Sequence, residues 1–100
     1  MNERILSMLG LARRAGRLSA GFDAVTESLQ RGRAQLVLIA SDISDRSRGN
    51  ICRTAEGAGC PVIILDIPQS AVGAAIGKKS GIVSVDDGGF AKKIQTLCNE

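Results

Sequence analysis

The sequence contains no histidine, no tryptophan and no tyrosine, and its only aromatic residues are Phe22 and Phe90. Histidine is the side chain most often used to move protons near neutral pH, so its absence lowers the expectation of an enzyme. Two phenylalanines also exclude a platform of aromatic rings on which nucleobases stack. Any contact with nucleic acid must therefore use charge, amide groups and the backbone.

Long hydrophobic runs are also missing. No stretch approaches the roughly 20 apolar residues of a membrane span, and no apolar leader follows a basic amino-terminal segment. We therefore expect a cytoplasmic protein that does not bind membranes. The three cysteines, Cys52, Cys60 and Cys98, are odd in number and have no histidine to assist them. A structural zinc site needs four closely spaced ligands, so we expect free, reduced, structural thiols and neither metal nor cofactor.

The charged residues are unevenly distributed along the chain. Thirteen Lys and Arg stand against ten Asp and Glu, and the whole excess lies in residues 1–50, which carry eight Arg and five acids. Such a bias is compatible with a polyanionic partner such as RNA. With 100 residues and 44% hydrophobic content, residues 1–100 form a single domain with a sizeable core.

Hydrophobic periodicity predicts alternating helices and strands. Gly32 is expected to end a helix in the left-handed conformation, and the run from Leu36 to Ala40 has no polar side chain, which is typical of a strand covered on both faces. Helices are predicted over residues 2–15, 22–31, 44–59, 68–76 and 90–97, and extended segments over 17–20, 35–40, 61–65 and 82–85. Like residues 35–40, residues 61–65 are expected to form a buried strand. This order predicts an α/β fold: a three-layer α/β/α sandwich with a mixed central sheet of about four strands.

Polar residues follow the buried strand directly. In sheets of this kind ligands bind at the carboxyl ends of the strands, where Ser41 and Asp42 lie. Asp42 with Asp45, and Asp86 with Asp87, pair carboxylates that could perform acid–base chemistry or hold Mg²⁺. Each pair also stands where a helix begins, and capping by Asp stabilises a helix by about 1 kcal/mol. We favour capping for both pairs.

Two basic segments have alternative interpretations. Residues 73–80 are similar to a phosphate-binding loop, but three residues rather than four separate the glycines and an extra Lys precedes Ser80, so a basic surface loop is favoured. Arg13, Arg14 and Arg17 form a cluster at a helix end. They could contact phosphates, or they could be solvated side chains that meet the negative pole of the helix dipole.

The order of several short motifs resembles the kink-turn-binding ribosomal protein superfamily of the seven-Ae type, and in particular its small bacterial YlxQ-type members. The motifs are Gly21-x-x-x-Val25-Thr26, Arg31-Gly32-x-Ala34-x-Leu36-Val37-Leu38-Ile39-Ala40-x-Asp42, Gly59-Cys60-Pro61-Val62, Val72-Gly73-x-Ala75-Ile76-Gly77, the run Leu9 to Leu18 and the run Gly89 to Ile94. Together they span nearly the whole chain.

This resemblance implies a non-enzymatic protein of translation that binds structured RNA, with ribosomal RNA as one candidate and no DNA partner. In the family the start of the second helix enters the widened groove of the kink, and a loop before the last strand closes over the flipped-out bulge. The RNA-binding residues expected here are Arg17, Gly21, Phe22, Asp23, Thr26, Glu27, Ser41, Asp42, Lys78, Lys79 and Ser80.

Where the family has Gly-Thr-Asn-Glu followed by a Lys, this chain has Gly21-Phe22-Asp23-Ala24 and then Glu27. Asp23 can accept hydrogen bonds but not donate them, Ala24 lacks a carboxylate, and Glu27 is negative where the family is positive. By analogy with DNA grooves, each lost base contact costs about 1 to 3 kcal/mol. An alternative is therefore a protein-interaction module that keeps the fold. A phosphate-ligand enzyme that uses Asp42 and Lys78 is the weakest hypothesis.

Overall fold

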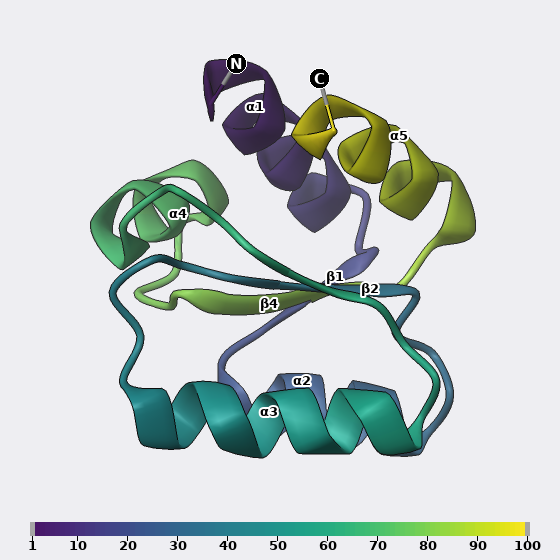
Figure 1. Ribbon diagram of the computed structural model, residues 1–100. Helices are drawn as coiled ribbons and strands as arrows, with labels where there is room; N and C mark the ends of the chain where they lie inside the picture. The colour runs from purple at the N-terminus through teal and green to yellow at the C-terminus, as the bar shows by residue number, and fades with distance from the viewer. Residues whose placement is uncertain (1, 100) are drawn as a thin grey trace.

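The computed structural model describes residues 2–99, which form five helices and four strands (Figure 1). In chain order the elements are α1 (Asn2–Arg14), β1 (Leu18–Ala20), α2 (Phe22–Gln30), β2 (Leu36–Ile39), α3 (Asp45–Gly57), β3 (Val62–Ile64), α4 (Gln69–Ile76), β4 (Ile82–Val85) and α5 (Gly88–Cys98).

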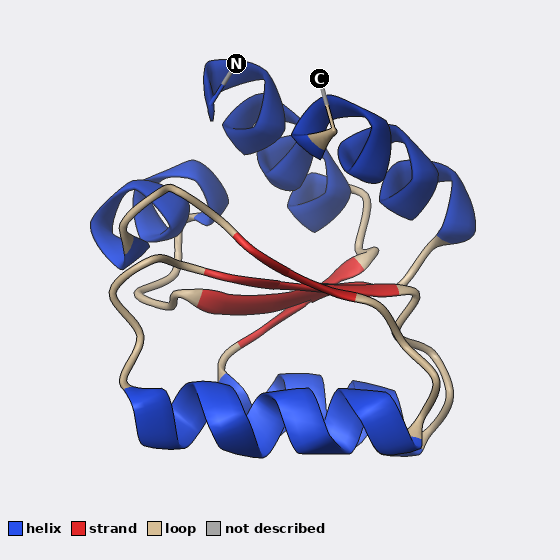
Figure 2. Cartoon of the chain, viewed as in Figure 1, coloured by secondary structure: helices blue, strands red, loops and turns tan. Residues whose placement is uncertain are grey.

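The four strands make one mixed sheet in the order β1-β4-β2-β3. β4 is antiparallel to both β1 and β2, whereas β2 and β3 are parallel. Leu18 and Leu36 both pair with Val85, so the beginnings of β1 and β2 flank the end of β4. Figure 2 shows α1, α4 and α5 on one face of the sheet and α2 and α3 on the other. The predicted three-layer sandwich with a mixed four-stranded sheet is confirmed.

Alternate side chains of the central strands enter two separate hydrophobic cores. In β2, Leu36 and Leu38 pack under α1, α4 and α5, whereas Val37 and Ile39 pack against α2 and α3. All four side chains are fully buried, because helices cover both faces of the sheet. This arrangement confirms the interpretation of the apolar run.

The predicted buried strand at residues 61–65 is an edge strand. β3 pairs only with β2, and Ile64 is 45% exposed, so this part of the prediction is wrong. An apolar run shows that a segment is extended, but it does not reveal whether the strand has a neighbour on both sides.

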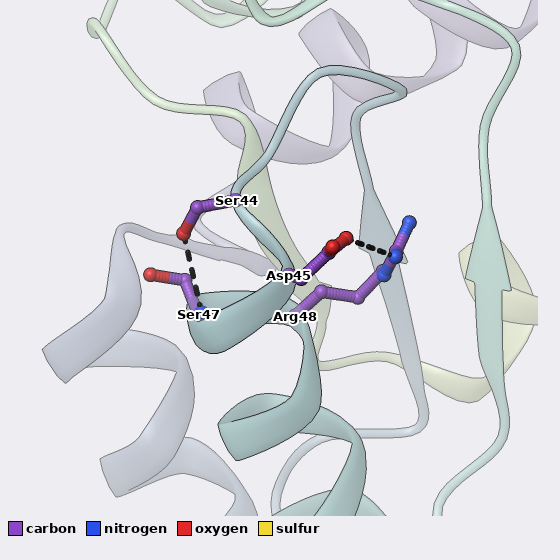
Figure 3. Close-up of polar contacts among 4 residues, drawn as sticks. All are labelled: Ser44, Asp45, Ser47 and Arg48. Atoms are coloured by element: carbon purple, nitrogen blue, oxygen red, sulfur yellow. Dashed lines mark hydrogen bonds and ion pairs between the residues drawn. The ribbon is translucent and has the colours of Figure 1, made fainter.

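Helix ends follow the expected cap chemistry. Gly32 has a φ of 72°, which is the left-handed conformation predicted for it, and Gly16 has the same φ. At α3, Ser44 caps the helix by accepting a hydrogen bond from the Ser47 N–H at 3.3 Å, and Asp45 pairs with Arg48 at 2.5 Å (Figure 3). α5 begins at Gly88 rather than at Phe90, because the Asp87 carboxylate caps it by accepting from the Phe90 N–H.

The three cysteines are free thiols. Burial raises the pKa of Cys60 and of Cys98, and the nearby negative charge of Asp86 raises the pKa of Cys60 further. Both thiols therefore stay protonated at neutral pH. Within residues 2–99, none of the helices is both long enough and apolar enough to cross a membrane.

Candidate functional site

Most of the predicted site residues lie along one edge of the sheet. The Gly21 N–H donates to the Ile82 carbonyl at 2.9 Å, and the Ala40 N–H donates to the Gly81 carbonyl at 2.7 Å. The ends of β1 and β2 therefore meet the beginning of β4 at this edge. We call it the Gly21 edge; it comprises Gly21, Phe22, Asp23, Ser41, Asp42, Lys78, Lys79 and Ser80.

The first turn of α2 presents unpaired backbone donors at this edge. Gly21 is the N-cap residue, and no side chain caps the helix there. The Val25 N–H donates to the Gly21 carbonyl, so the N–H groups of Phe22, Asp23 and Ala24 have no partner within the helix. Such a helix end attracts anions through these donors and through the helix dipole.

Glycine is required at position 21 by the backbone itself. Its φ of 101° with a ψ of 156° lies in a region that residues with a side chain almost never adopt. Space is not the limit, because a Cβ at this position would lie 3.9 Å from the nearest neighbour, the Lys78 Nζ.

A side-chain hydrogen bond joins the loop after α4 to the end of β1, two residues before α2 begins. The Lys78 Nζ donates to the Ala20 carbonyl at 3.1 Å, although 58 residues separate them in sequence. Lys79 is exposed and has no side-chain partner in the described part of the chain. The Ser80 hydroxyl bonds to the backbone of Ile82. Lys78 and Ser80 thus shape the loop, whereas Lys79 is free to meet a ligand.

The backbone of residues 73–80 decides between the two interpretations of this segment. Gly77 ends α4 with a φ of 73°, and its N–H donates to the Gly73 carbonyl. Gly73 lies inside α4, where a Cβ would come within 3.0 Å of the Lys78 carbonyl. The segment is therefore a helix end followed by a basic loop, as predicted, and not a phosphate-binding loop.

The exposed side of α2 continues from this edge. Phe22 is 39% exposed, and the Thr26 hydroxyl donates to the Phe22 carbonyl at 2.8 Å. Asp23 is exposed and makes no hydrogen bond or ion pair within residues 2–99. Glu27 forms an ion pair with Arg31 at 2.9 Å, so its negative charge has a counter-charge one turn away.

Asp42 is a helix cap, as favoured, but for a helix distant in sequence. Its Oδ1 accepts a hydrogen bond from the Gln69 N–H at 2.8 Å and so caps α4, whose own N-cap residue, Pro68, has no capping side chain. Ser41 is exposed, and its N–H donates to the Ile67 carbonyl. Both residues support the Gly21 edge by holding α4 in place.

Arg17 is separated from the other predicted site residues. Arg17 precedes β1 and Gly21 follows β1. The four residue steps from Arg17 to Gly21 span about 13 Å of extended chain. The Arg17 carbonyl accepts from the Asp86 N–H at 2.8 Å, which places Arg17 at the opposite edge of the sheet.

Asp86 has a role that sequence reasoning missed. It was considered as a cap for the last helix, but Asp87 supplies that cap. The Asp86 carboxylate instead accepts hydrogen bonds from the hydroxyls of Ser19 (2.5 Å), Ser28 (2.7 Å) and Ser84 (2.9 Å). Two of these serines are almost completely buried. The signals of this cluster in the sequence are Ser28 on the otherwise apolar inner face of α2 and Ser84 within the apolar run of β4.

Comparison with known proteins gives the same family as the motifs. The model of the ribosomal protein L7Ae/L30e/S12e/Gadd45 family matches residues 3–95. The RNA-binding protein YlxQ of Bacillus subtilis (strain 168) is 32% identical over 91 residues, which cover 90% of each chain. The protein of the same name from Enterococcus faecium is 26% identical over 95 residues, covering 95% of this chain and 91% of its own.

Solved structures show the same fold. A protein with unknown function from Bacillus halodurans C superimposes with a TM-score of 0.90 at 32% identity, covering 96% of this chain and 97% of its own. The Giardia lamblia 15.5kD RNA binding protein gives a TM-score of 0.77 at 20% identity over 98% of this chain and 87% of its own. The chain belongs to the ribosomal protein L7Ae/L30e/S12e/Gadd45 family, and its relatives named YlxQ are of the type that its motifs predict.

Proposed function

We propose that this protein binds structured, kink-turn-like RNA at the Gly21 edge and acts in translation, with ribosomal RNA as the first candidate ligand. The observation that carries the proposal is the uncapped start of α2 beside the loop of Lys78, Lys79 and Ser80, joined to it by the hydrogen bond from Lys78 to Ala20. Two relatives that match nearly the whole chain are named RNA-binding proteins, which supports RNA as the ligand.

In this proposal, different groups of the Gly21 edge contact different parts of the RNA. The unpaired N–H groups of the first turn of α2 bind a phosphate group of the RNA, and the free ammonium of Lys79 adds a charge contact. Contrary to the expectation from the sequence that contacts use charge, amide groups and the backbone alone, the single exposed ring of Phe22 offers an apolar surface to one unstacked base. Binding and positioning of RNA need no bond to be made or broken.

The departures from the family pattern differ in their consequences. Glu27 is paired with Arg31, so the phosphate of a bound RNA meets a neutral pair rather than an isolated negative charge. Asp23 has no such partner and lies directly at the first turn of α2. We therefore expect Asp23 to weaken RNA binding more than Glu27 does.

Titration of a labelled kink-turn RNA and of an unkinked duplex at two salt concentrations tests the proposal. We expect tighter binding of the kink-turn and a loss of affinity for both RNAs as salt rises, because phosphate contacts release counterions. Replacement of the free lysine, Lys79→Gln, should weaken kink-turn binding about threefold or more, since it removes one phosphate contact. The matched control Lys92→Gln lies on α5, away from the edge, and should change the affinity less than twofold. Absence of binding to either RNA at low salt would refute RNA binding.

The alternative is a protein-interaction module, which the exposed, unpartnered carboxylate of Asp23 favours. The triple variant Asp23→Asn, Ala24→Glu, Glu27→Lys separates the two functions, because it restores the family residues at positions 23, 24 and 27. If the wild type binds RNA weakly and the variant binds tightly, the fold supports RNA binding and the site has diverged. A pull-down that resists nuclease and is lost on charge reversal at Asp23 and Glu27 would instead favour a protein partner.

A further inference from the structure

Four arginines lie at the edge of the sheet opposite to the Gly21 edge. Arg13 and Arg14 end α1, Arg17 precedes β1, and Arg33 lies between α2 and β2. All four are exposed, and none of their side chains makes an ion pair or hydrogen bond within residues 2–99. We call this group the arginine edge. The proposed kink-turn contact uses none of these four residues.

Asp86 holds the two segments that carry Arg17 and Arg33. The Asp86 N–H donates to the Arg17 carbonyl at 2.8 Å, and the Asp86 Oδ1 accepts from the Ser28 hydroxyl at 2.7 Å. The Ser28 carbonyl in turn accepts from the Arg33 N–H at 2.9 Å. Because β1 and β2 both pair with β4, their beginnings lie two strand spacings apart, about 10 Å. The two arginines are thus fixed at one edge by the backbone.

Nearby acids do not form ion pairs with these arginines. Both carboxylate oxygens of Asp86 accept hydrogen bonds from serine hydroxyls, and the Asp87 Oδ2 accepts from the Phe90 N–H. Arg31, which is close in sequence to Arg33, is already paired with Glu27. The four guanidinium groups of the arginine edge therefore face solvent with their hydrogen-bond donors unused.

The chemistry of this edge fits the phosphate backbone of RNA. Guanidinium groups bind phosphate oxygens with two parallel hydrogen bonds, and contacts of this kind position a nucleic acid without reading its sequence. Protein interfaces and membrane-surface helices typically combine charges with several exposed apolar side chains. Of the large apolar residues that the described part of the chain exposes, Leu11 lies on α1 beside Arg14, whereas Phe22 and Ile64 lie away from the arginine edge. Four charges beside one exposed apolar side chain therefore favour RNA.

We propose that the arginine edge is a second RNA-binding surface, which holds a different RNA segment from the one at the Gly21 edge. The two edges lie at opposite ends of the strands, and about 13 Å separates Arg17 from Gly21 along β1. The protein then joins two segments of a folded RNA. This surface does not depend on kink-turn recognition, and it goes beyond the proposed function.

The variant Arg17→Gln, Arg33→Gln tests this surface, because it removes two charges without removing any side-chain contact described in the structure. The probe is a fluorescein-labelled RNA duplex of about 20 base pairs with no bulge, titrated between about 50 and 200 mM KCl, the range over which phosphate contacts weaken steeply. We expect at least a fivefold loss of affinity at the low salt concentration. The slope of log affinity against log salt should fall by about 1 to 2, since each phosphate contact contributes about 0.9.

The control is Arg53→Gln, Lys92→Gln, which removes the same charge from α3 and α5, together with the exposed hydrogen bond from Arg53 to Asn50, and should change the affinity less than twofold. Thermal unfolding should be the same for both variants and the wild type. Equal behaviour of the two variants overturns the proposal, as does a wild type that does not bind the duplex at about 50 mM KCl, where non-specific binding should be strong. Equally tight binding of polyglutamate would also overturn it, because it would indicate an acidic protein partner.

The two proposals fail in different ways. If the wild type binds kink-turn and duplex RNA equally well, but the Arg17→Gln, Arg33→Gln variant still loses duplex affinity, only the proposal for the Gly21 edge is contradicted. If the wild type prefers the kink-turn, but replacing these two arginines does not change duplex affinity, only the proposal for the arginine edge is contradicted.

Discussion

The Asp86 carboxylate makes more side-chain hydrogen bonds than any other side chain in the described part of the chain. This carboxylate accepts hydrogen bonds from hydroxyls on β1, α2 and β4. The Asp86 N–H donates to the carbonyl of Arg17, the residue before β1. Ser28 and Ser84 are almost completely buried, so without Asp86 their hydroxyls would have no acceptor there. This one carboxylate therefore ties the sheet to α2 and also places the segments of the arginine edge.

We predict that Asp86→Ala destabilises the protein by about 2 to 5 kcal/mol, since each buried hydroxyl left without a partner costs about 1 to 3 kcal/mol. Asp86→Asn keeps one carbonyl acceptor and should cost less. The control Asp66→Ala removes an exposed carboxylate and should change the free energy of unfolding by less than about 0.5 kcal/mol. Urea unfolding measures all three variants, and an Asp86→Ala protein as stable as the control would disprove the role of this cluster.

Individual site residues were only partly predictable from the sequence. Gly21 and Gly32 have conformations that only glycine adopts readily, so their roles could be inferred locally. The partners of Asp42 and Asp86 could not, because they lie on elements that are distant in sequence and that only the fold brings together. A carboxylate near a helix start indicates capping, but not which helix it caps.

Helices and strands were predicted more reliably than their positions relative to one another. The buried run of β2 and the left-handed glycines mark elements through local chemistry. The order β1-β4-β2-β3 places the last strand of the chain between the first two, and nothing local encodes this insertion. For the same reason the sequence did not show that β3 is an edge strand. The separation of Arg17 from Gly21, by contrast, follows from the predicted extended segment between them.

Asp42 and Ser44 cap different helices. Asp42→Ala should cost about 1 kcal/mol by removing the cap of α4, and Ser44→Ala should cost about as much by removing the cap of α3. Hydrogen exchange in the native state distinguishes them. Amides of α4 should exchange faster in the Asp42 variant and amides of α3 in the Ser44 variant. Faster exchange in α3 for both variants would show that Asp42 caps the nearer helix.

As a whole, the molecule is a sandwich whose sheet ends in two different polar surfaces. One edge combines an uncapped helix start with a free lysine, and the other presents four unpaired arginines. The hydrophobic cores on the two faces of the sheet hold these edges at a fixed separation. A protein built in this way suits the joining of RNA segments better than the chemistry of a small substrate.

The central claim is that RNA binds at the Gly21 edge, and amide chemical-shift mapping during titration with kink-turn RNA tests it most directly. The account predicts that the largest changes fall on residues 21–27 and 78–80, and that they diminish as salt rises because phosphate contacts are lost. Amides in the middle of α3 and α5 should change little. Saturable RNA binding that leaves residues 21–27 and 78–80 unshifted would contradict the account.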